Sequence, residues 1–325
     1  MLAHEKAVLF NTQLTAKNSK LIYPPQNFVD LIWKEKPARS KEPIFIQPME
    51  FTGKEASAKL AELRAWIKQQ PPATLSYSKA PATPAQMHVG TLITSLSSIG
   101  IFSILFLFSK HYNDVFDPAY LLNLRGGDIP FNPLFQSYFF LSLDRAVLFT
   151  DSAKVKEEVR DYLHSLGIER KEYNDLWTFL RRREWGEGKV LISPQTSYAI
   201  SLMLTHFRYT IAPSIVDDVK AVKNELEIEG MRRAYLRDGA SFVRWFAWLD
   251  DKLSQGFDIT EYEAAWRLTE FRKQNKHYWG LAYENISASG PNAGMWYSTE
   301  FLIGQYSWFI GQHFLTTRRR KTKRE

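Results

Sequence analysis

The chain has 325 residues, of which 45% are hydrophobic and 24% charged, a balance that excludes a disordered polypeptide and leaves room for two or three domains. It contains no cysteine, which excludes disulfides, thiolate metal sites and a cysteine nucleophile. The net charge is +7, but residues 318–325 hold six basic residues and one acidic residue, so the rest of the chain carries only +2.

The basic run from Arg318 to Arg324 could act as a nuclear-import signal or bind anions, but a solvated, disordered end is the simpler interpretation. The start of the chain does not resemble a secretory signal, and together with the lack of cysteine this favours a cytoplasmic location. The apolar run Leu92–Ser109 is interrupted by serine and threonine. It predicts a buried strand or an aggregation-prone insert and no membrane span.

The first part of the chain predicts little regular structure. A short strand is expected over Lys20–Asn27, a short helix over Asn27–Trp33, and a proline-containing linker up to residue 48. A helix is then expected over Lys54–Gln70 and a loop over residues 71–88. The apolar residues expected on one face of that helix are Ala58, Leu60, Leu63, Trp66 and Ile67.

Strand and helix patterns alternate from residue 119 to residue 204, which predicts a layered α/β domain that ends near Asp217. The expected order is strand 119–124, turn-rich loop 125–133, hairpin strands 137–143 and 146–150, helix 153–165 capped by Asp151 or Ser152, helix 177–183, strand 189–193 and helix 197–204.

Two long amphipathic helices are expected next. The first runs from Asn224 to about Leu253. The second runs to about Lys276 and starts at Thr260-Glu-Tyr-Glu263, a capping box in which the threonine and the second glutamate each bond the other's backbone N–H. A glycine break at Gly256 separates them, so the pair predicts a helical hairpin.

The generic catalytic motifs for nucleotide binding, serine hydrolases and zinc peptidases are absent. Arg125-Gly-Gly-Asp128 could form a phosphate-binding nest, but one glycine pair is weak support and a plain turn is favoured. For His206 and His277 we favour packing roles, because a lone histidine needs partners to become a ligand or a base.

Longer phrases carry a family resemblance. Ala119–Pro133, Lys220-Ala-Val-Lys-Asn224, Glu229-Gly-Met-Arg-Arg-Ala234 with Asp238, and Ser287-Ala-Ser-Gly-Pro-Asn-Ala293 follow one another in order. Together they resemble the cytosolic three-domain Xaa-Pro aminopeptidases of eukaryotes, over most of residues 18–99 and 119–293.

The resemblance implies an α/β fold: a creatinase N-terminal-like (ribonuclease H-like) domain followed by an incomplete pita-bread catalytic domain. Residues 1–48 would be a remnant of a first N-terminal domain and linker, 49–217 the second such domain, 218–293 the start of the peptidase domain, and 294–325 a disordered non-family tail. Relatives remove the N-terminal residue from peptides with proline in second position, using two manganese ions per subunit that activate a water. The expected partners are peptide substrates with an N-terminal Xaa-Pro. A homodimer is left open, and no nucleic-acid or membrane partner is expected.

The chain departs from this family after Gly290. Relatives place a catalytic His-Tyr pair shortly after the Ser-Gly-Pro-Asn phrase, but here Trp296 precedes Tyr297, and tryptophan offers no base. Between Pro291 and Glu325 there is no aspartate, and Glu300, Glu325 and His313 are the only glutamates and histidine. No catalytic, cofactor-binding or metal-ligating residue can be assigned, so this chain is expected to be inactive.

A second departure is an apparent foreign insert at residues 100–118. Both departures begin at a glycine, Gly100 before Ile101 and Gly294 before Met295. A glycine codon followed by a codon that starts with AT can contain G-T-A-T, which looks like an intron start, so our hypothesis is unspliced intron read in frame. Two alternatives stay open. One is a non-catalytic pseudoenzyme that acts as a binding or dimerisation module, and the other is a different role on the creatinase fold, such as prolidase-like dipeptide hydrolysis.

Overall fold

The structure is a computed structural model that describes residues 2–17, 19–22, 28–72, 82–94, 117–205, 208–283 and 285–294. These residues form two compact units, one that ends at Asn224 and one that starts at Glu225. The expected insert at 100–118 lies almost wholly outside the described residues. The expected tail at 294–325 also lies outside them, apart from Gly294. Within the described residues, no helix is long and apolar enough to cross a membrane.

The first unit is built on a mixed sheet of six strands in the order β6-β5-β4-β2-β7-β8 among the described residues. The strands are β2 (His88–Thr94), β4 (Tyr138–Ser142), β5 (Ala146–Phe149), β6 (Ile168–Lys171), β7 (Lys189–Ile192) and β8 (Tyr209–Ile211). Strand β4 pairs antiparallel with β2 on one side and with β5 on the other. The other pairs are parallel: β5 with β6, β2 with β7, and β7 with β8. A separate short ribbon pairs β1 (Phe45–Ile46) with β3 (Leu124–Arg125).

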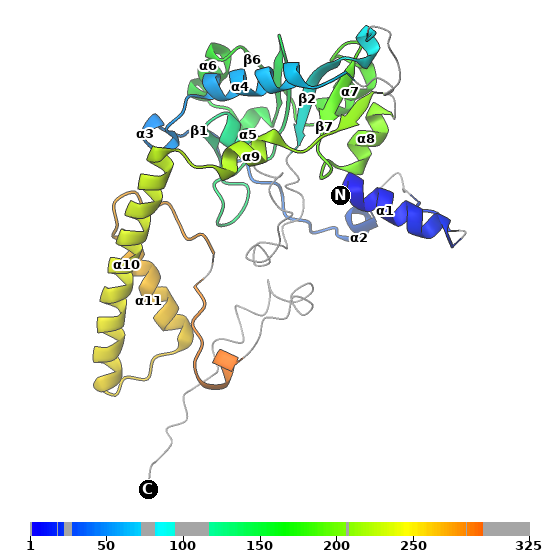
Figure 1. Ribbon diagram of the computed structural model, residues 1–325. Helices are drawn as coiled ribbons and strands as arrows, with labels where there is room; N and C mark the ends of the chain where they lie inside the picture. Colours follow the sequence, from blue (N-terminus) through cyan, green and yellow to red (C-terminus); the bar gives the residue numbers. More distant parts are fainter. Residues whose placement is uncertain are drawn as a thin grey trace. The chain divides into compact units, whose positions relative to one another are not determined.

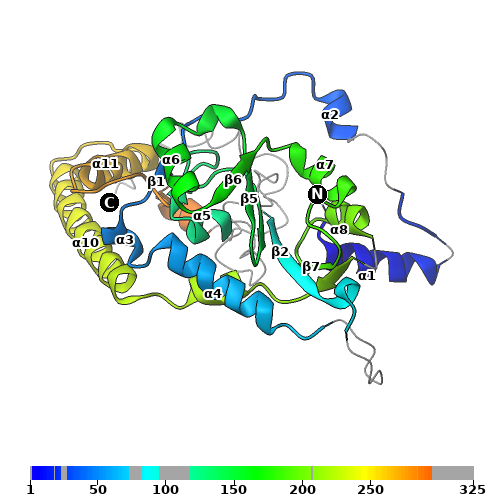
Figure 2. The same cartoon turned by 90° about the horizontal axis from the view of Figure 1, so that it is seen from above.

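Helices cover both faces of this sheet (Figures 1 and 2). One face packs against α4 (Ala56–Gln69), α5 (Asp117–Leu121), α6 (Glu157–Ser165) and α9 (Ile215–Ala221), and the other against α7 (Asp175–Arg182) and α8 (Tyr198–Leu204). Helix α1 (His4–Thr15) lies against α8, and α2 (Phe28–Ile32) and α3 (Met49–Thr52) are short. The unit is therefore a three-layer α/β domain.

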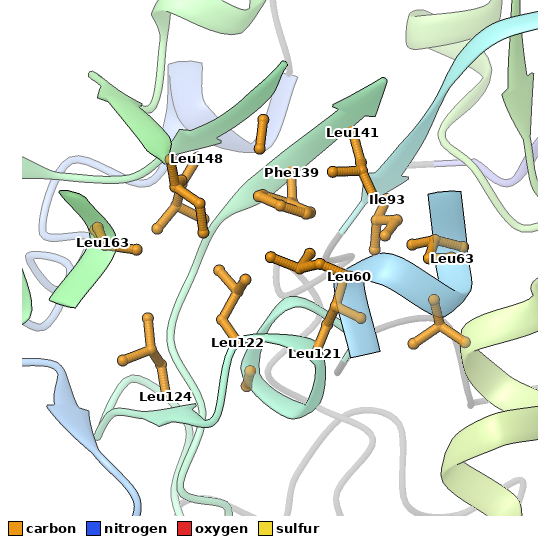
Figure 3. Close-up of a cluster of buried hydrophobic side chains, with 14 of the residues drawn as sticks. Leu60, Leu63, Ile93, Leu121, Leu122, Leu124, Phe139, Leu141, Leu148 and Leu163 are labelled. Carbon is orange, nitrogen blue, oxygen red and sulfur yellow. The ribbon is translucent and has the colours of Figure 1, made fainter. Parts of the chain in front are cut away.

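Two hydrophobic cores follow from the alternation of side chains along the central strands. In β4, Phe139 and Leu141 enter the core beneath α4 and α6, whereas Tyr138 and Phe140 enter the core beneath α7 and α8. Figure 3 shows the first core, where Leu60 and Leu63 of α4 lie beside Ile93, Phe139 and Leu141 of the sheet.

Most of the expected elements between residues 137 and 204 are confirmed. The hairpin around Asp144–Arg145 is β4 and β5. The elements expected at 177–183, 189–193 and 197–204 are α7, β7 and α8. The expected helix over Lys54–Gln70 is α4, with Leu60, Leu63 and Ile67 buried, although Ala58 faces solvent and Ala56 takes the buried position.

The expected strand over 119–124 is wrong. Residues 117–121 form α5, and only Leu124 continues into the short strand β3. A six-residue apolar run cannot distinguish a buried strand from one buried turn of helix. Asn123, which adopts a left-handed backbone with φ 52°, ends the helical turn, and Arg125 donates to the carbonyl oxygen of Ala119 at 2.8 Å.

The helix expected from residue 153 begins later. Asp151 accepts a hydrogen bond from the backbone N–H of Ala153 at 2.9 Å, but the turn it caps is a 3₁₀ turn over Ser152–Lys154, and α6 starts at Glu157. Residues 19–22 form no strand, and the rest of the strand expected over Lys20–Asn27 lies outside the described residues. The loop expected over 71–88 contains a 3₁₀ turn at Pro84–Gln86 and ends where β2 begins.

The second unit contains α10 (Glu225–Ser254) and α11 (Glu261–Lys273), which lie side by side as the expected helical hairpin (Figure 1). The capping box is confirmed: Thr260 Oγ1 accepts from the backbone N–H of Glu263 at 3.1 Å, and the Glu263 carboxylate accepts from the N–H of Thr260 at 2.9 Å. A 3₁₀ turn over Gly290–Gly294 ends the described part of this unit.

Candidate functional site

The segment that holds the Ser287–Ala293 phrase is tied to the first turn of α11 by one carboxylate. Glu261 Oε1 accepts from Ser289 Oγ at 2.8 Å, and Oε2 accepts from Asn292 Nδ2 at 3.0 Å. Burial acts to raise the pKa of Glu261, but the hydrogen bonds from Ser289 and Asn292 outweigh it, so the pKa lies below its usual value. Glu261 is therefore a charged anchor for this segment.

A second anchor lies one step upstream. Asn285 Nδ2 donates to the carbonyl oxygen of Ala265 at 2.9 Å and to Thr269 Oγ1 at 2.6 Å, and its Oδ1 accepts from Arg272. Arg272 also forms a bidentate ion pair with Asp238 of α10, with Nε–Oδ1 at 2.6 Å and Nη2–Oδ2 at 3.1 Å. Asp238, which stands out in the sequence pattern, therefore joins α10, α11 and the segment after them.

Polar contacts also fix the hairpin itself. Trp245 Nε1 donates to the carbonyl oxygen of Ala264 at 2.7 Å, and Asn275 Nδ2 donates to Ser241 Oγ at 2.8 Å. Ser241 is buried, although it lies in the middle of α10. The side of α10 that carries Asp238, Ser241 and Trp245 is thus the side that meets α11.

The Arg125–Asp128 loop is the plain turn that the sequence favours. The N–H groups of Gly126 and Asp128, which a phosphate nest would need free, donate to the carbonyl oxygens of Pro133 and Leu134 at 3.2 and 2.9 Å. The Asp128 carboxylate accepts from the N–H of Gln136 at 2.7 Å and forms a buried ion pair with Lys154. The N–H groups of Gly126 and Asp128 are therefore already bonded within the domain.

The expected packing roles of the histidines can be judged for His277 only. His277 is exposed in a turn after α11, with φ 64°, so it lies on the surface. His206 lies outside the described residues.

The sequence did not single out a Ser–His pair near the N-terminus. His4 Nδ1 lies 3.0 Å from Ser201 Oγ, and Ser201 Oγ donates to the carbonyl oxygen of Tyr198 at 2.8 Å. Because the Ser201 hydroxyl donates to this carbonyl oxygen, we interpret the contact with His4 as a packing hydrogen bond. The pair attaches α1 to α8.

The implied metal pair was tested against the side chains that the structure describes. Nowhere in those residues do three or more histidine, cysteine, aspartate or glutamate side chains come together as a possible metal site. A two-metal centre needs several convergent carboxylates. The described residues therefore do not fit the two manganese ions.

Comparisons with known proteins agree on one family. A family model described as the creatinase/prolidase N-terminal domain matches residues 113–227. Probable Xaa-Pro aminopeptidase P of Laccaria bicolor is 33% identical over 299 residues, which is 91% of this chain and 41% of that protein. The protein of the same name from Sordaria macrospora is 33% identical over 282 residues, 83% of this chain and 40% of that protein.

A solved structure gives the same answer. The X-prolyl aminopeptidase of Caenorhabditis elegans, described as a cytosolic enzyme with a di-nuclear active site, superimposes with a TM-score of 0.73 at 26% identity, over 88% of this chain and 42% of that chain. Over most of its length the chain is a relative of the Xaa-Pro aminopeptidases P. Its fold is that of the creatinase N-terminal domain followed by part of the aminopeptidase P catalytic fold.

The chain spans about 40% of the length of the relatives that it matches. Within the chain, the family phrases at Asp238 and Ser287–Ala293 serve as anchors of the α10–α11 hairpin. Sequence reasoning missed Glu261 as the partner of the second phrase. The only hint of its role in the sequence was its place in the capping box. An acidic residue is common in the first turn of a helix, because it stabilises the helix N-terminus, so Glu261 did not suggest a further role.

Proposed function

We propose that this chain supplies the second N-terminal domain and the start of the catalytic domain of an Xaa-Pro aminopeptidase, a metallopeptidase that removes the N-terminal residue of peptides with proline in second position. The supporting observation is the 33% identity to aminopeptidase P over 91% of the chain. On this proposal residues 49–217 are the N-terminal-like domain, 218–293 start the pita-bread domain, 1–48 are a remnant of a first domain, and 294–325 are foreign to the family.

For the chain as it stands we propose no peptidase activity. The two manganese ions that the family implies would need aspartate, glutamate and histidine ligands, and residues 291–325 offer only Glu300, Glu325 and His313. A cytoplasmic location is part of the same proposal, supported by the nematode enzyme's description as cytosolic.

The test is the release of the N-terminal residue from an Xaa-Pro-Pro peptide by the purified chain with added Mn²⁺. We expect no release above the rate without protein. Metal-dependent turnover that purifies with the chain would overturn the proposed inactivity, while leaving the family assignment intact.

The role of the gene product is tested separately, by an antibody against residues 117–224 used on extracts of the source cell. A polypeptide about twice this length, whose depletion removes Xaa-Pro cleavage, supports an active peptidase. A polypeptide near this length, with cleavage unchanged, supports instead a non-catalytic binding or dimerisation module. The exposed apolar side chains of Leu236, Val243 and Phe246 on α10 are the observation that favours that second candidate.

A further inference from the structure

The turn at Gly53 is bonded on both sides by asparagines that lie far along the chain. Asn224 Nδ2 donates to the carbonyl oxygen of Thr52 at 2.8 Å, and Asn123 Nδ2 donates to the carbonyl oxygen of Lys54 at 2.8 Å. Two of the family phrases supply these asparagines. The phrase that ends at Asn224 has no role in the site described above.

The core of the first unit holds this turn in place. Asn123 is 4% exposed, and its Oδ1 accepts from Lys59 Nζ at 2.7 Å. Lys59 and Thr52 are themselves buried, at 3% exposure each. Buried polar groups of this kind are costly to leave without partners, so the bonds around the turn resist opening. Asn224 therefore donates to a partner whose position the core fixes.

Gly53 is a second, independent observation. Its backbone is left-handed, with φ 64°, but that alone does not demand glycine, because Asn123 and Arg183 adopt φ 52° and 54° in the same unit. A Cβ on Gly53 would lie 2.8 Å from both Cγ and Nδ2 of Asn224, closer than such atoms approach in proteins. Glycine at this position therefore makes room for the Asn224 side chain.

Asn224 lies at the boundary between the two units. It is the last residue of the first unit, and α10 begins at Glu225. The residues before it are also attached to the first unit: Val216 of α9 is buried in the core, and the Tyr120 hydroxyl donates to the carbonyl oxygen of Val219 at 3.4 Å.

We propose that Asn224 and the Gly53 turn form a junction anchor, which holds the connector after α9 on the first unit up to the residue before α10. Asn224 is then a positioning residue, and the start of α10 is fixed at one end by the first unit. That this connector leads into a catalytic domain rests on the proposed function, whereas the anchor itself does not.

An asparagine before a helix has an ordinary alternative role, because its side-chain oxygen can cap the first turn. Asn224→Asp separates the two roles. Aspartate caps a helix as well as asparagine does, but it has no Nδ2 and cannot donate to the Thr52 carbonyl. A capping role therefore survives this substitution and an anchoring role does not.

The experiment is amide hydrogen exchange of the purified chain, followed by mass spectrometry over residues 219–224 and compared with the core strand β4 in the same sample. We expect Asn224→Asp and Asn224→Ala each to accelerate exchange at residues 219–224 by about fivefold or more relative to β4, the effect of losing one hydrogen bond. Asn132→Ala is the control and should leave these residues unchanged, because Asn132 bonds the Pro130 carbonyl in an exposed loop.

Glycine variants test the same contact from its other side. Gly53→Ala displaces the Asn224 side chain and should accelerate exchange at residues 219–224 although Asn224 is intact. Gly167→Ala is matched for backbone strain, since Gly167 has φ 66° and open space around its Cβ position, and it should leave the junction unchanged. Adding Gly53→Ala to Asn224→Ala should bring little further acceleration, because the same bond is already lost.

Two results would overturn the proposal. If Asn224→Asp exchanges like the unaltered chain at residues 219–224, Asn224 serves only to cap α10. If Gly53→Ala accelerates the junction no more than Gly167→Ala does, the Gly53 turn does not hold Asn224. Neither result depends on peptidase activity, so failure of the anchor and failure of the proposed function are distinguishable.

Discussion

At the scale of single residues, the ion pair of Lys154 and Asp128 is almost fully removed from water, since the two side chains are 3% and 2% exposed. Breaking such a pair leaves one charge buried without its partner, which costs far more than losing an exposed pair. We therefore expect Lys154→Met to lower the free energy of unfolding by about 3–5 kcal/mol, measured by urea denaturation.

Two controls belong with this variant. Lys273→Met removes a lysine from an exposed pair with Glu270 and should lower the free energy of unfolding far less than Lys154→Met. Adding Asp128→Asn to Lys154→Met removes the stranded charge and should recover a substantial part of the loss. If the two lysine variants prove equally stable, the buried pair of Lys154 and Asp128 contributes no more to stability than the exposed pair.

His88 gives the first domain a dependence on pH. Burial, reinforced by the positive charge of Lys189, lowers the pKa of His88 below its usual 6.5, and Nε2 lies 2.9 Å from Thr210 Oγ1. Above pH 6.5 the imidazole is neutral in the folded and unfolded chains alike. As the pH falls through 6.5 towards the folded pKa, the unfolded chain takes up a proton that the folded chain does not, so stability falls.

The prediction is a decline in unfolding free energy as the pH falls below 6.5, measured by urea denaturation at a series of pH values. In His88→Gln this part of the decline should be absent, because glutamine does not titrate. A variant with the same pH profile as the unaltered chain would assign the decline to other groups.

Residues of this kind could not be found from the sequence. Lys59 and Lys154 are charged, and the sequence pattern places charged residues at the surface by default. Both are buried: Lys59 Nζ donates to Asn123 Oδ1 at 2.7 Å and Lys154 pairs with Asp128. Each partner lies far along the chain, so only the folded structure reveals the pairing.

At the scale of elements, prediction succeeded where local chemistry and tertiary structure agree. The Asp144–Arg145 turn between two apolar runs fixed the hairpin of β4 and β5, and the capping box at Thr260 fixed the start of α11. It failed where the run was short: residues 117–121 are helical because α5 packs on α4 and the sheet, a contact that no local pattern encodes.

Helix α1 was missed for a related reason. Its amphipathic pattern is weak, with only Ala7 buried, and α1 is attached mainly by specific bonds to the stretch before α8. The N–H groups of His4 and Glu5 donate to the carbonyl oxygens of Thr196 and Pro194 at 2.9 and 3.1 Å. Such attachments leave no periodic signal in the sequence.

The anchoring of the Ser287–Ala293 segment by α11 gives an element-scale prediction. Glu261→Ala removes the acceptor for Ser289 and Asn292, so amide hydrogen exchange of residues 287–293 should accelerate while α11 stays helical. Glu270→Ala is the matched control, because Glu270 lies on the same helix and bonds Lys273 instead. Equal exchange in both variants would mean that other contacts hold the segment.

At the scale of the whole molecule, the resemblance rests on four phrases spread in order along the chain, and identity to aminopeptidases P over 91% of the chain confirms it. What each phrase does could not be read in the same way. In the sequence, Asp238 and Ser287–Ala293 resemble parts of a catalytic domain. In the structure, their hydrogen bonds join α10 to α11 and α11 to the segment that follows it.

The missing ligand set leads to a prediction for the whole chain. A metal that binds the folded state and not the unfolded state raises the melting temperature in proportion to the logarithm of its concentration above Kd. Since no candidate metal cluster exists among the described residues, and residues 291–325 add only two glutamates and one histidine, we expect Mn²⁺ to leave the melting temperature unchanged. Mg²⁺ at the same concentration controls for ionic strength. A rise specific to Mn²⁺, saturating as a site fills, would contradict the proposed loss of the metal centre even if no peptide were cleaved, because binding would then survive where catalysis does not.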